Sequence, residues 1–471
     1  MARAGAISIF AAVLATRGVE AIRSTQLAPT PSARSWRPPP PGSLVARRGA
    51  DGEWVFSESS ASSLLEDKPV PRLGAEPASA AEGLPQPGQS FFDWIRTVDN
   101  PDKWHDTTWA IKALTPFLEM DHPTKMSPLG NASGISMAEG DCYDRNSVDG
   151  LRELPAWLID VTILEFELDA LEVKLHALWD VVDFFVVLEK PMTDTGHWKP
   201  LMWERNMNTE RFAIFRGKVL HLVVDHIEAK PKAHTSNWAS WTWEDEFEAR
   251  ASREFLDALL PALLGRGGAG PRPGEVVVSV GDAMDIPHPT NMQLMKRCEP
   301  RTLPIDSAVW VPTGDVSRAC HAEYPFTLDS PYIGGGSTYL DPATTSLRRG
   351  LSHHAQVGRF LIGGWRFRGY AYPPYVLMNE VVSAKGDREL VARLADYLAD
   401  GGSWSGLMPT LLHKYFDRPE ECCMPATQLR RGWPFLDEPQ LLQLPPSIAS
   451  NPERYEVWHG RDDRRCSLPI P

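Results

Sequence analysis

The 471-residue sequence lacks any block of basic residues longer than two or three, and its formal net charge is -13. A protein that binds nucleic acid in general needs a basic face to neutralise phosphates, so this charge argues against that class. No apolar run reaches about 18 residues, the length that predicts a full transmembrane helix. The six cysteines include no C-x-x-C spacing, so neither a zinc ribbon nor a thioredoxin-type motif is expected.

Apolar residues, by contrast, make up 42% of the chain. This is enough for one large core or two smaller ones, which excludes a short peptide or a wholly disordered chain. Tryptophan and proline are frequent, with 17 and 42 copies. The first indicates flat apolar surfaces, and the second indicates long irregular segments.

The amino-terminal residues 1–21 have the layout of a secretory signal peptide or a short signal-anchor. Arg3 precedes the small and apolar run 4–15, which is shorter than a membrane span; an Ala-rich tail without function is the alternative. Residues 22–89 are rich in Pro, Ser and Ala without apolar periodicity, so we expect a disordered stem or linker. Asn131 begins a glycosylation sequon, which matters only in a secreted chain. One or two disulfides are compatible with the cysteine count.

A regular alternation of strand and helix patterns begins near residue 158. Strands are expected at residues 158–164, 181–189, 218–224 and 275–280, and helices at 168–179 and 243–264. Such alternation requires crossover connections, so it predicts an α/β fold with a mostly parallel sheet and helices on both faces.

Acidic residues follow each predicted strand. Ligands of open α/β sheets lie beyond the carboxyl ends of the strands, where this chain has Glu165, Glu167, Glu189, Asp225, Asp282 and Asp285. Like charges gathered there repel one another unless a cation or a donor-rich ligand joins them. A hard divalent cation takes carboxylate oxygens and can hold a diphosphate. A single acid after a strand is as often a helix cap or turn residue, and we expect Glu167 and Asp169 to cap the following helix.

Several motifs occur in an order that resembles one known family. Residues 159–178 and 182–189 resemble its opening, and residues 282–287 (DAMDIP) resemble its Asp-x-Asp-Glu-Ile-Pro element. Residues 363–365 (GGW) resemble the start of its Gly-Trp-His-Cys element, and residues 451–455 (NPERY) resemble its Asn-Pro-Glu-Arg-Phe signature. The family is glycosyltransferase family 17, which contains the β-1,4-mannosyl-glycoprotein 4-β-N-acetylglucosaminyltransferases.

The resemblance implies a GT-A-like catalytic domain over residues 155–460, preceded by a pre-domain segment at 90–154 and followed by a tail at 461–471. It implies inverting transfer of GlcNAc from UDP-GlcNAc to a mannose of a glycoprotein N-glycan, assisted by a divalent cation, Mn²⁺. It also implies the secretory pathway, in the Golgi lumen, with the amino terminus as a removable signal or a membrane anchor. No nucleic-acid partner is expected.

Two motifs depart from the family pattern. Met284 stands where the motif has its second Asp, and Asp285 stands where it has Glu. A thioether is a poor ligand for a hard cation. Arg366 and Phe367 replace the His and Cys of the later element, so Arg366 and Arg368 could contact phosphate in place of the missing metal charge.

The expected site residues follow from the resemblance and from the acids at the strand ends. Metal binding is expected for Asp282 and Asp285, donor binding for Glu189, Asp282, Arg366 and Arg368, acceptor contact for Trp365 and Trp243, and catalysis for Asp285 and Glu244. On an ideal strand residues 282 and 285 face opposite sides, so a shared role needs an irregular backbone. Glu189 could equally form a buried ion pair, the tryptophans could pack in the core, and Glu244 could favour a helix dipole. The rival functions are a transferase of changed donor or acceptor and a glycan-binding pseudoenzyme.

Overall fold

The computed structural model describes a part of the chain. The described residues are 44–48, 54–58, 83–98, 100–120, 142, 148–193, 195–223, 275–301, 305–310, 312–313, 315–319, 335–340, 360–367, 372–383, 386–402, 424–425 and 445–451. All of them belong to the compact unit Pro38–Pro471. The expected signal at 1–21, the sequon at Asn131 and the expected helix at 243–264 lie outside the described residues. Within the described ranges, every helix is too short or too polar to cross a bilayer.

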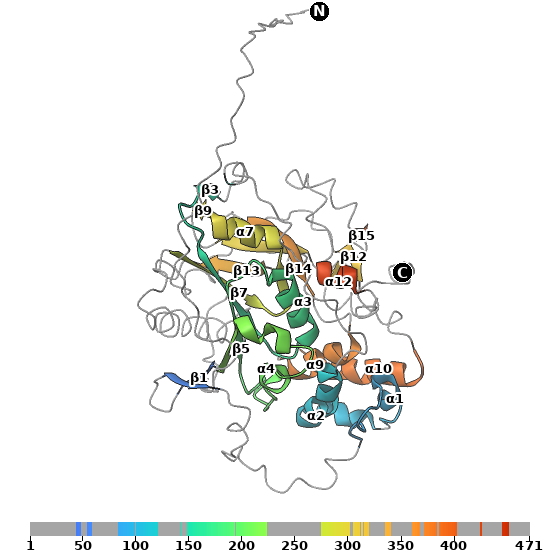
Figure 1. The fold of residues 1–471 in the computed structure, drawn as a ribbon. Helices are drawn as coiled ribbons and strands as arrows, with labels where there is room; N and C mark the ends of the chain where they lie inside the picture. The colour runs from blue at the N-terminus through green and yellow to red at the C-terminus, as the bar shows by residue number, and fades with distance from the viewer. Residues whose placement is uncertain are drawn as a thin grey trace, which may run out of the picture. The chain divides into compact units, whose positions relative to one another are not determined.

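The centre of the molecule is a parallel four-stranded core within a larger sheet (Figure 1). Its strands lie in the order β6-β5-β4-β7 and are parallel to their neighbours; their bounds are Val219–Val223, Phe184–Glu189, Trp157–Ile163 and Val276–Asp282. Every residue of β5 and β6 is buried, as expected for strands covered on both faces. The structure therefore confirms the four predicted strands.

The helix α3, Leu168–Leu178, connects β4 to β5 as predicted. Its apolar positions 168, 171, 175 and 178 are all buried. Between β5 and β6 the chain forms α4, Met202–Asn206, and the 3-10 helix η5, Ala213–Lys218. These crossovers bring the carboxyl ends of the parallel strands to one edge, where ligands of such sheets lie.

The other half of the sheet is mixed. After β7 the order is β13-β10-β14-β8, with bounds Gly335–Leu340, Ile305–Trp310, Phe360–Arg366 and Asp285–Pro287. The strand β13 is antiparallel to β7 and to β10, β14 is parallel to β10, and β8 is antiparallel to β14. Although β8 follows β7 in sequence, it pairs with β14 and thereby joins the two halves of the sheet.

Two strands lie inside the segment that was expected to be a stem. β1, Leu44–Arg48, pairs in parallel with β6, and β2, Trp54–Glu58, pairs with β1 in antiparallel fashion. The interpretation of residues 22–89 as a continuous stem is therefore wrong at these positions. Each run has only five residues, and it becomes a strand because β6 offers an open edge for backbone hydrogen bonding.

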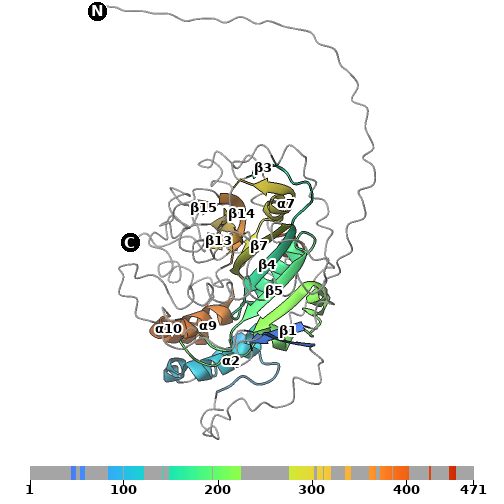
Figure 2. The same ribbon diagram turned by 90° about the vertical axis from the view of Figure 1, so that its left-hand side faces the viewer.

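A helical group contains the pre-domain segment together with a later part of the chain (Figures 1 and 2). Its members are α1, Phe91–Ile95, η2, Pro101–His105, α2, Thr107–Glu119, α9, Pro373–Val382, and α10, Arg388–Ala399. The rings of Trp94, Trp104 and Trp109 lie 5.3 to 6.2 Å apart and are buried. The Tyr372 hydroxyl donates to the Phe117 carbonyl at 2.9 Å, so α2 and α9 share one core.

A smaller group of elements surrounds α7, Pro289–Arg297. The strand β9, Cys298–Pro300, follows it and pairs with β3, Val148–Leu151. Cys142 and Cys298 form a disulfide. The remaining described elements are β11, Pro312–Thr313, β12, Asp315–Ala319, β15, Met424–Pro425, and α12, Pro446–Ser450.

Candidate functional site

A two-residue turn at the carboxyl end of β7 brings two aspartates together. Asp282 ends β7 and Asp285 begins β8, with Ala283 and Met284 between them. The amide of Ala283 donates to the carbonyl of Ile163 at 2.9 Å, which ties the turn to the end of β4. The amide of Asp282 lies 3.3 Å from Asp285 Oδ2. The backbone is thus irregular here, and both acids serve one site although their spacing on an ideal strand would separate them.

The Arg366 guanidinium contacts both of these carboxylates. Its Nη2 lies 2.9 Å from Asp282 Oδ2, and its Nη1 lies 3.5 Å from Asp285 Oδ1. The side chains of Arg366 and Asp282 are 20% and 25% exposed, whereas that of Asp285 is 4% exposed. The cluster therefore has a solvent-facing end, formed by Asp282 and Arg366, and a buried end at Asp285.

Strand pairing fixes the position of Arg366. In the antiparallel register of β14 and β8, Arg366 lies opposite Asp285 and Gly364 lies opposite Pro287. Gly364 has φ +114°, and a Cβ there would overlap the carbonyl oxygen of Ile286. Only glycine tolerates both conditions without strain, so Gly364 allows the close approach that places Arg366 on the aspartates.

Asp285 has an unusual titration. Burial raises the pKa of this carboxyl to about 6, while the charge of Arg366 lowers it and that of Asp282 raises it. A carboxyl with a pKa in this range changes its protonation near neutral pH, which is a common property of functional sites.

The side chain of Met284 contacts Tyr375 on α9. Its sulfur lies 3.5 Å from the hydroxyl of Tyr375, and that hydroxyl donates to Glu167 Oε1 at 2.7 Å. Burial, followed by the charge of Glu167, raises the pKa of Tyr375 well above its ordinary value. Tyr375 therefore stays protonated and serves as a donor.

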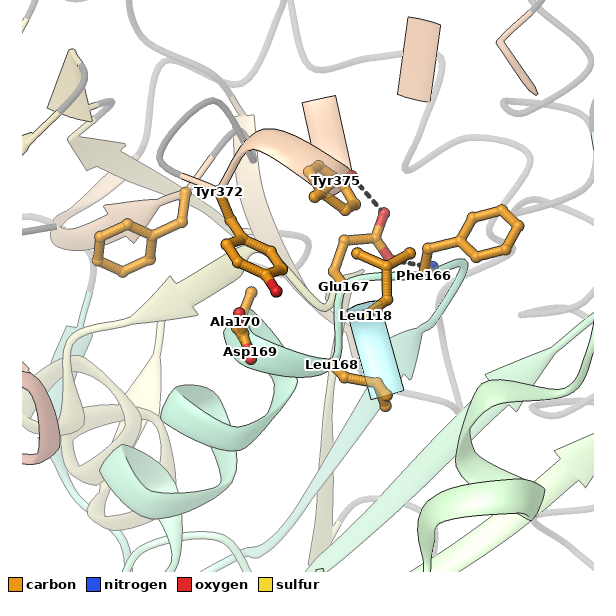
Figure 3. Close-up of a pocket in the computed structure, with 9 residues that line it drawn as sticks. Leu118, Phe166, Glu167, Leu168, Asp169, Ala170, Tyr372 and Tyr375 are labelled. Carbon is orange, nitrogen blue, oxygen red and sulfur yellow. Dashed lines mark hydrogen bonds between the residues drawn. The ribbon is translucent and has the colours of Figure 1, made fainter. Parts of the chain in front are cut away.

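The same tyrosine lines a small cavity of about 20 Å³ (Figure 3). Tyr372 and Tyr375 at the start of α9 lie over Glu167 and Asp169 at the start of α3. A volume of this size has room for about one water molecule, so the cavity is too small for a sugar.

The prediction that the side chains of Glu167 and Asp169 cap α3 is wrong, because both side chains make other contacts. Glu167 occupies the N-cap position, but its side chain makes no cap hydrogen bond. Instead Oε2 accepts from the upstream amides of Glu165 and Phe166, because the chain turns back on itself there. Asp169 forms an ion pair with Arg211.

Glu189 lies in the interior. Its side chain is fully buried, its oxygens accept from the amide of Trp203 at 3.1 and 3.2 Å, and Oε2 lies 2.8 Å from His221 Nε2. This arrangement joins the end of β5 to the start of α4 and matches the structural alternative given for Glu189, rather than donor contact.

Of the other predicted site residues, one is buried and the rest lie outside the part of the chain that the structure describes. Trp365 is 4% exposed, and its ring centroid lies 5.6 Å from that of His288, which is a core position. Glu244, Trp243, Arg368 and Asp225 lie outside the described residues.

Lys174 contributes to the site without having been predicted. Its ammonium is fully buried, lies 3.1 Å from Asp160 Oδ1 and donates to the carbonyl of Asp282 at 3.2 Å. It therefore holds the end of β7 from the side of α3. The available signal was a lysine on the apolar face of a helix, three residues after Leu171 and one before Leu175.

The described donors do not fit the divalent cation that the family resemblance implies. Both aspartates contact a guanidinium, and the third motif position holds a thioether that packs beside Tyr375. Hard cations take six or more oxygen ligands. Nowhere among the described residues do three or more His, Cys, Asp or Glu side chains gather into a group that could hold a metal ion.

Comparison with known proteins finds that part of this chain is similar to one family of enzymes. Residues 116–308 match the model of glycosyltransferase family 17, a range that includes β4 to β8 and begins earlier than the expected boundary at 155. Residues 363–365 and 451–455 lie beyond it. The β-1,4-mannosyl-glycoprotein 4-beta-N-acetylglucosaminyltransferases of Rattus norvegicus and Homo sapiens are each 29% identical over 145 residues, which is 31% of this chain and 22% of the relative. The Mus musculus enzyme of that name is 28% identical over the same length.

The matched region thus spans only about a fifth of those relatives, 22% of their length. The family-model match at residues 116–308 contains the strands β4 to β7 and the acidic turn with Asp282 and Asp285, whereas Arg366 lies beyond it. On this match, residues 116–308 of the chain are similar to glycosyltransferase family 17.

Proposed function

We propose that this chain transfers GlcNAc from UDP-GlcNAc, in β-1,4 linkage and with inversion, to a mannose of a glycoprotein N-glycan. The observation that carries the proposal is the match of residues 116–308 to a glycosyltransferase family over the parallel strands β4 to β7, at whose carboxyl end Asp282 and Asp285 meet Arg366. The names of the curated relatives support the sugar and the acceptor.

The fold in this proposal is GT-A-like, with helices on both faces of the sheet. Four parallel strands, a following antiparallel strand β13 and an acidic pair at the end of β7 support it. Ligands of such sheets bind beyond the carboxyl ends of the strands, which is where the cluster lies.

The reaction requires a nucleophile, a base and charge stabilisation. The mannose hydroxyl attacks the anomeric carbon of GlcNAc, the bond from that carbon to the diphosphate oxygen breaks, and the electron pair leaves with UDP. A carboxylate takes the hydroxyl proton, and cationic groups stabilise the charge on the leaving diphosphate. In this proposal Asp282 and Arg366 face the donor because their side chains reach solvent. Glu244, outside the described residues, is our proposed base.

The compartment in this proposal is the secretory pathway, with the Golgi lumen as the site of action. The disulfide between Cys142 and Cys298 supports an oxidising compartment, because such bonds are rare in the cytosol. A glycan on Asn131 that peptide N-glycosidase removes would support this route. A cytosolic chain without that glycan would contradict it.

The direct test is a transfer assay with the purified full chain, UDP-GlcNAc and a mannose-terminated N-glycan. The proposal predicts a product that is heavier than the acceptor by one N-acetylhexosamine. An enzyme that cleaves β-linked GlcNAc should remove this added sugar. Failure to form this product, together with failure to hydrolyse UDP-GlcNAc, would refute it.

The same assay, extended, tests the two alternative functions. A panel of other sugar nucleotides and acceptors detects a transferase of changed specificity. The contact of Met284 with Tyr375 favours a glycan-binding pseudoenzyme, since the family's second motif carboxylate is absent. Glycan binding without turnover of any donor would identify that case.

A further inference from the structure

The two departures of this chain from the family motifs occur at one place in the structure. Relative to the motifs that this chain resembles, Met284 stands where a carboxylate is expected, and Arg366 adds a permanent cation. The amide of Phe367, next to Arg366, donates to the carbonyl of Met284 at 3.1 Å. The loss of a negative group and the gain of a positive group are therefore adjacent, as they would be if one compensated for the other.

Arg366 has the geometry of a bound cation between two acids. It lies 2.9 Å from Asp282 and 3.5 Å from Asp285, and the pairing of β14 with β8 fixes its backbone. A guanidinium is always charged and presents five N–H donors in one plane, which suits bidentate binding of phosphate. Because a fifth of the side chain is exposed, an anion can reach it from the solvent side of Asp282.

Lys174 adds a second positive charge behind this cluster. Its ammonium is 3.2 Å from the carbonyl oxygen of Asp282 and is itself paired with Asp160. The end of β7 therefore lies between a buried ammonium on one side and the guanidinium on the other. Because the pair of Lys174 and Asp160 carries no net charge, its contribution is to fix the backbone at Asp282.

We propose that Arg366 takes the place of the divalent cation and binds the diphosphate of a nucleotide donor without a metal ion. Asp282 and Asp285 are then positioning residues that hold the guanidinium rather than metal ligands. This inference rests on the proposed function, because it assumes that the cluster faces a nucleotide diphosphate.

The test measures UDP binding to the full chain by calorimetry, once in EDTA and once with Mn²⁺. We expect the two dissociation constants to agree within about twofold. Arg366→Gln should raise the dissociation constant at least about tenfold in both buffers, and Arg366→Lys should have an intermediate effect because the charge remains but the planar fork is lost. The matched control is Arg205→Gln, since Arg205 also forms an ion pair, with Glu119 on α2, and should leave UDP binding unchanged.

The outcomes separate this inference from the function on which it rests. Binding that needs Mn²⁺ and is indifferent to Arg366→Gln would overturn the inference and leave the transferase proposal in place. Absence of UDP binding in both buffers would overturn both. The comparison of the two buffers uses the natural chain, so it decides whether UDP binding needs a metal ion even if Arg366→Gln does not fold, and Arg366→Lys then tests the role of the guanidinium.

Discussion

Asp285 is a buried acid whose neighbours act on it in opposite directions. Burial raises its pKa from 3.8 to about 6 despite the nearby Arg366 charge. The folded protein therefore holds this proton more tightly than the unfolded chain does. The stability that Asp285 contributes is fully present below about pH 3.8 and is lost as the pH rises to about 6.

This titration predicts a pH-dependent difference between the natural chain and Asp285→Asn. The variant cannot ionise at this position, so its unfolding free energy should rise relative to that of the natural chain between about pH 4 and pH 6. Urea unfolding of both proteins at several pH values measures the difference. A difference that is constant over that range would contradict the titration.

Met284 supports a second prediction at the scale of one residue. The side chain is partly buried against the core and its sulfur contacts Tyr375, which already donates to Glu167. Met284→Asp would place a second carboxylate beside Glu167, so it should destabilise the protein by roughly 1–3 kcal/mol, the scale of a poorly compensated buried polar group. Met284→Leu, the matched control, should cost less than about 1.5 kcal/mol. Thermal unfolding of both variants tests this, and equal melting temperatures would count against the described contact.

At the scale of elements, the site depends on the close pairing of β14 with β8. Gly364→Ala would place a Cβ against the carbonyl of Ile286 at a φ of +114°. We expect a loss of about 2–4 kcal/mol in stability, since strain and a backbone clash act together, and weaker UDP binding because Arg366 shifts. Gly217→Ala is the control: its Cβ would meet no atom within 4 Å, so its effect should stay within about 0.5 kcal/mol. Urea unfolding gives both values, and a mild Gly364→Ala effect would show that the pairing is looser than described.

Helices and strands with a clear hydrophobic pattern in their own sequence could be predicted, and those without one could not. The strands β4 to β7 and the helix α3 were predictable because long runs of Val, Ile, Leu and Phe have clear periods. The strands β1 and β2 were not, since five-residue runs within a Pro-rich segment become strands only when β6 is beside them.

The site was predictable in part for a related reason. Asp282 and Asp285 were found because acids after strands are a local signal. The contact of Arg366 with Asp282 joins residues 84 apart in sequence and depends on which strand β8 pairs with. The burial of Glu189 likewise follows from His221 on β6 and Trp203 on α4, which sequence spacing does not reveal.

For the whole molecule, the disulfide between Cys142 and Cys298 closes a long stretch of chain. The two cysteines are 156 residues apart, and the chain-entropy argument predicts that closing so long a loop stabilises the fold by roughly 2–5 kcal/mol. Reduction should lower the midpoint of urea unfolding accordingly. The Cys142→Ser/Cys298→Ser double variant should show the lower midpoint already and should not respond to reductant. A natural chain that unfolds at the same urea concentration with and without reductant would contradict the prediction.

The most direct test of the whole account is the rate of UDP-GlcNAc turnover, with the N-glycan acceptor present, by the natural chain and by Asp282→Ala. Asp282 is partly exposed and ends β7, so its removal should leave the fold intact while Arg366 loses one of its two carboxylate partners. We predict that turnover falls at least about a hundredfold, because a displaced Arg366 no longer stabilises the charge on the leaving diphosphate, and that the circular dichroism spectrum is unchanged. Turnover by a folded Asp282→Ala protein at nearly the natural rate would contradict the account and place the active site elsewhere.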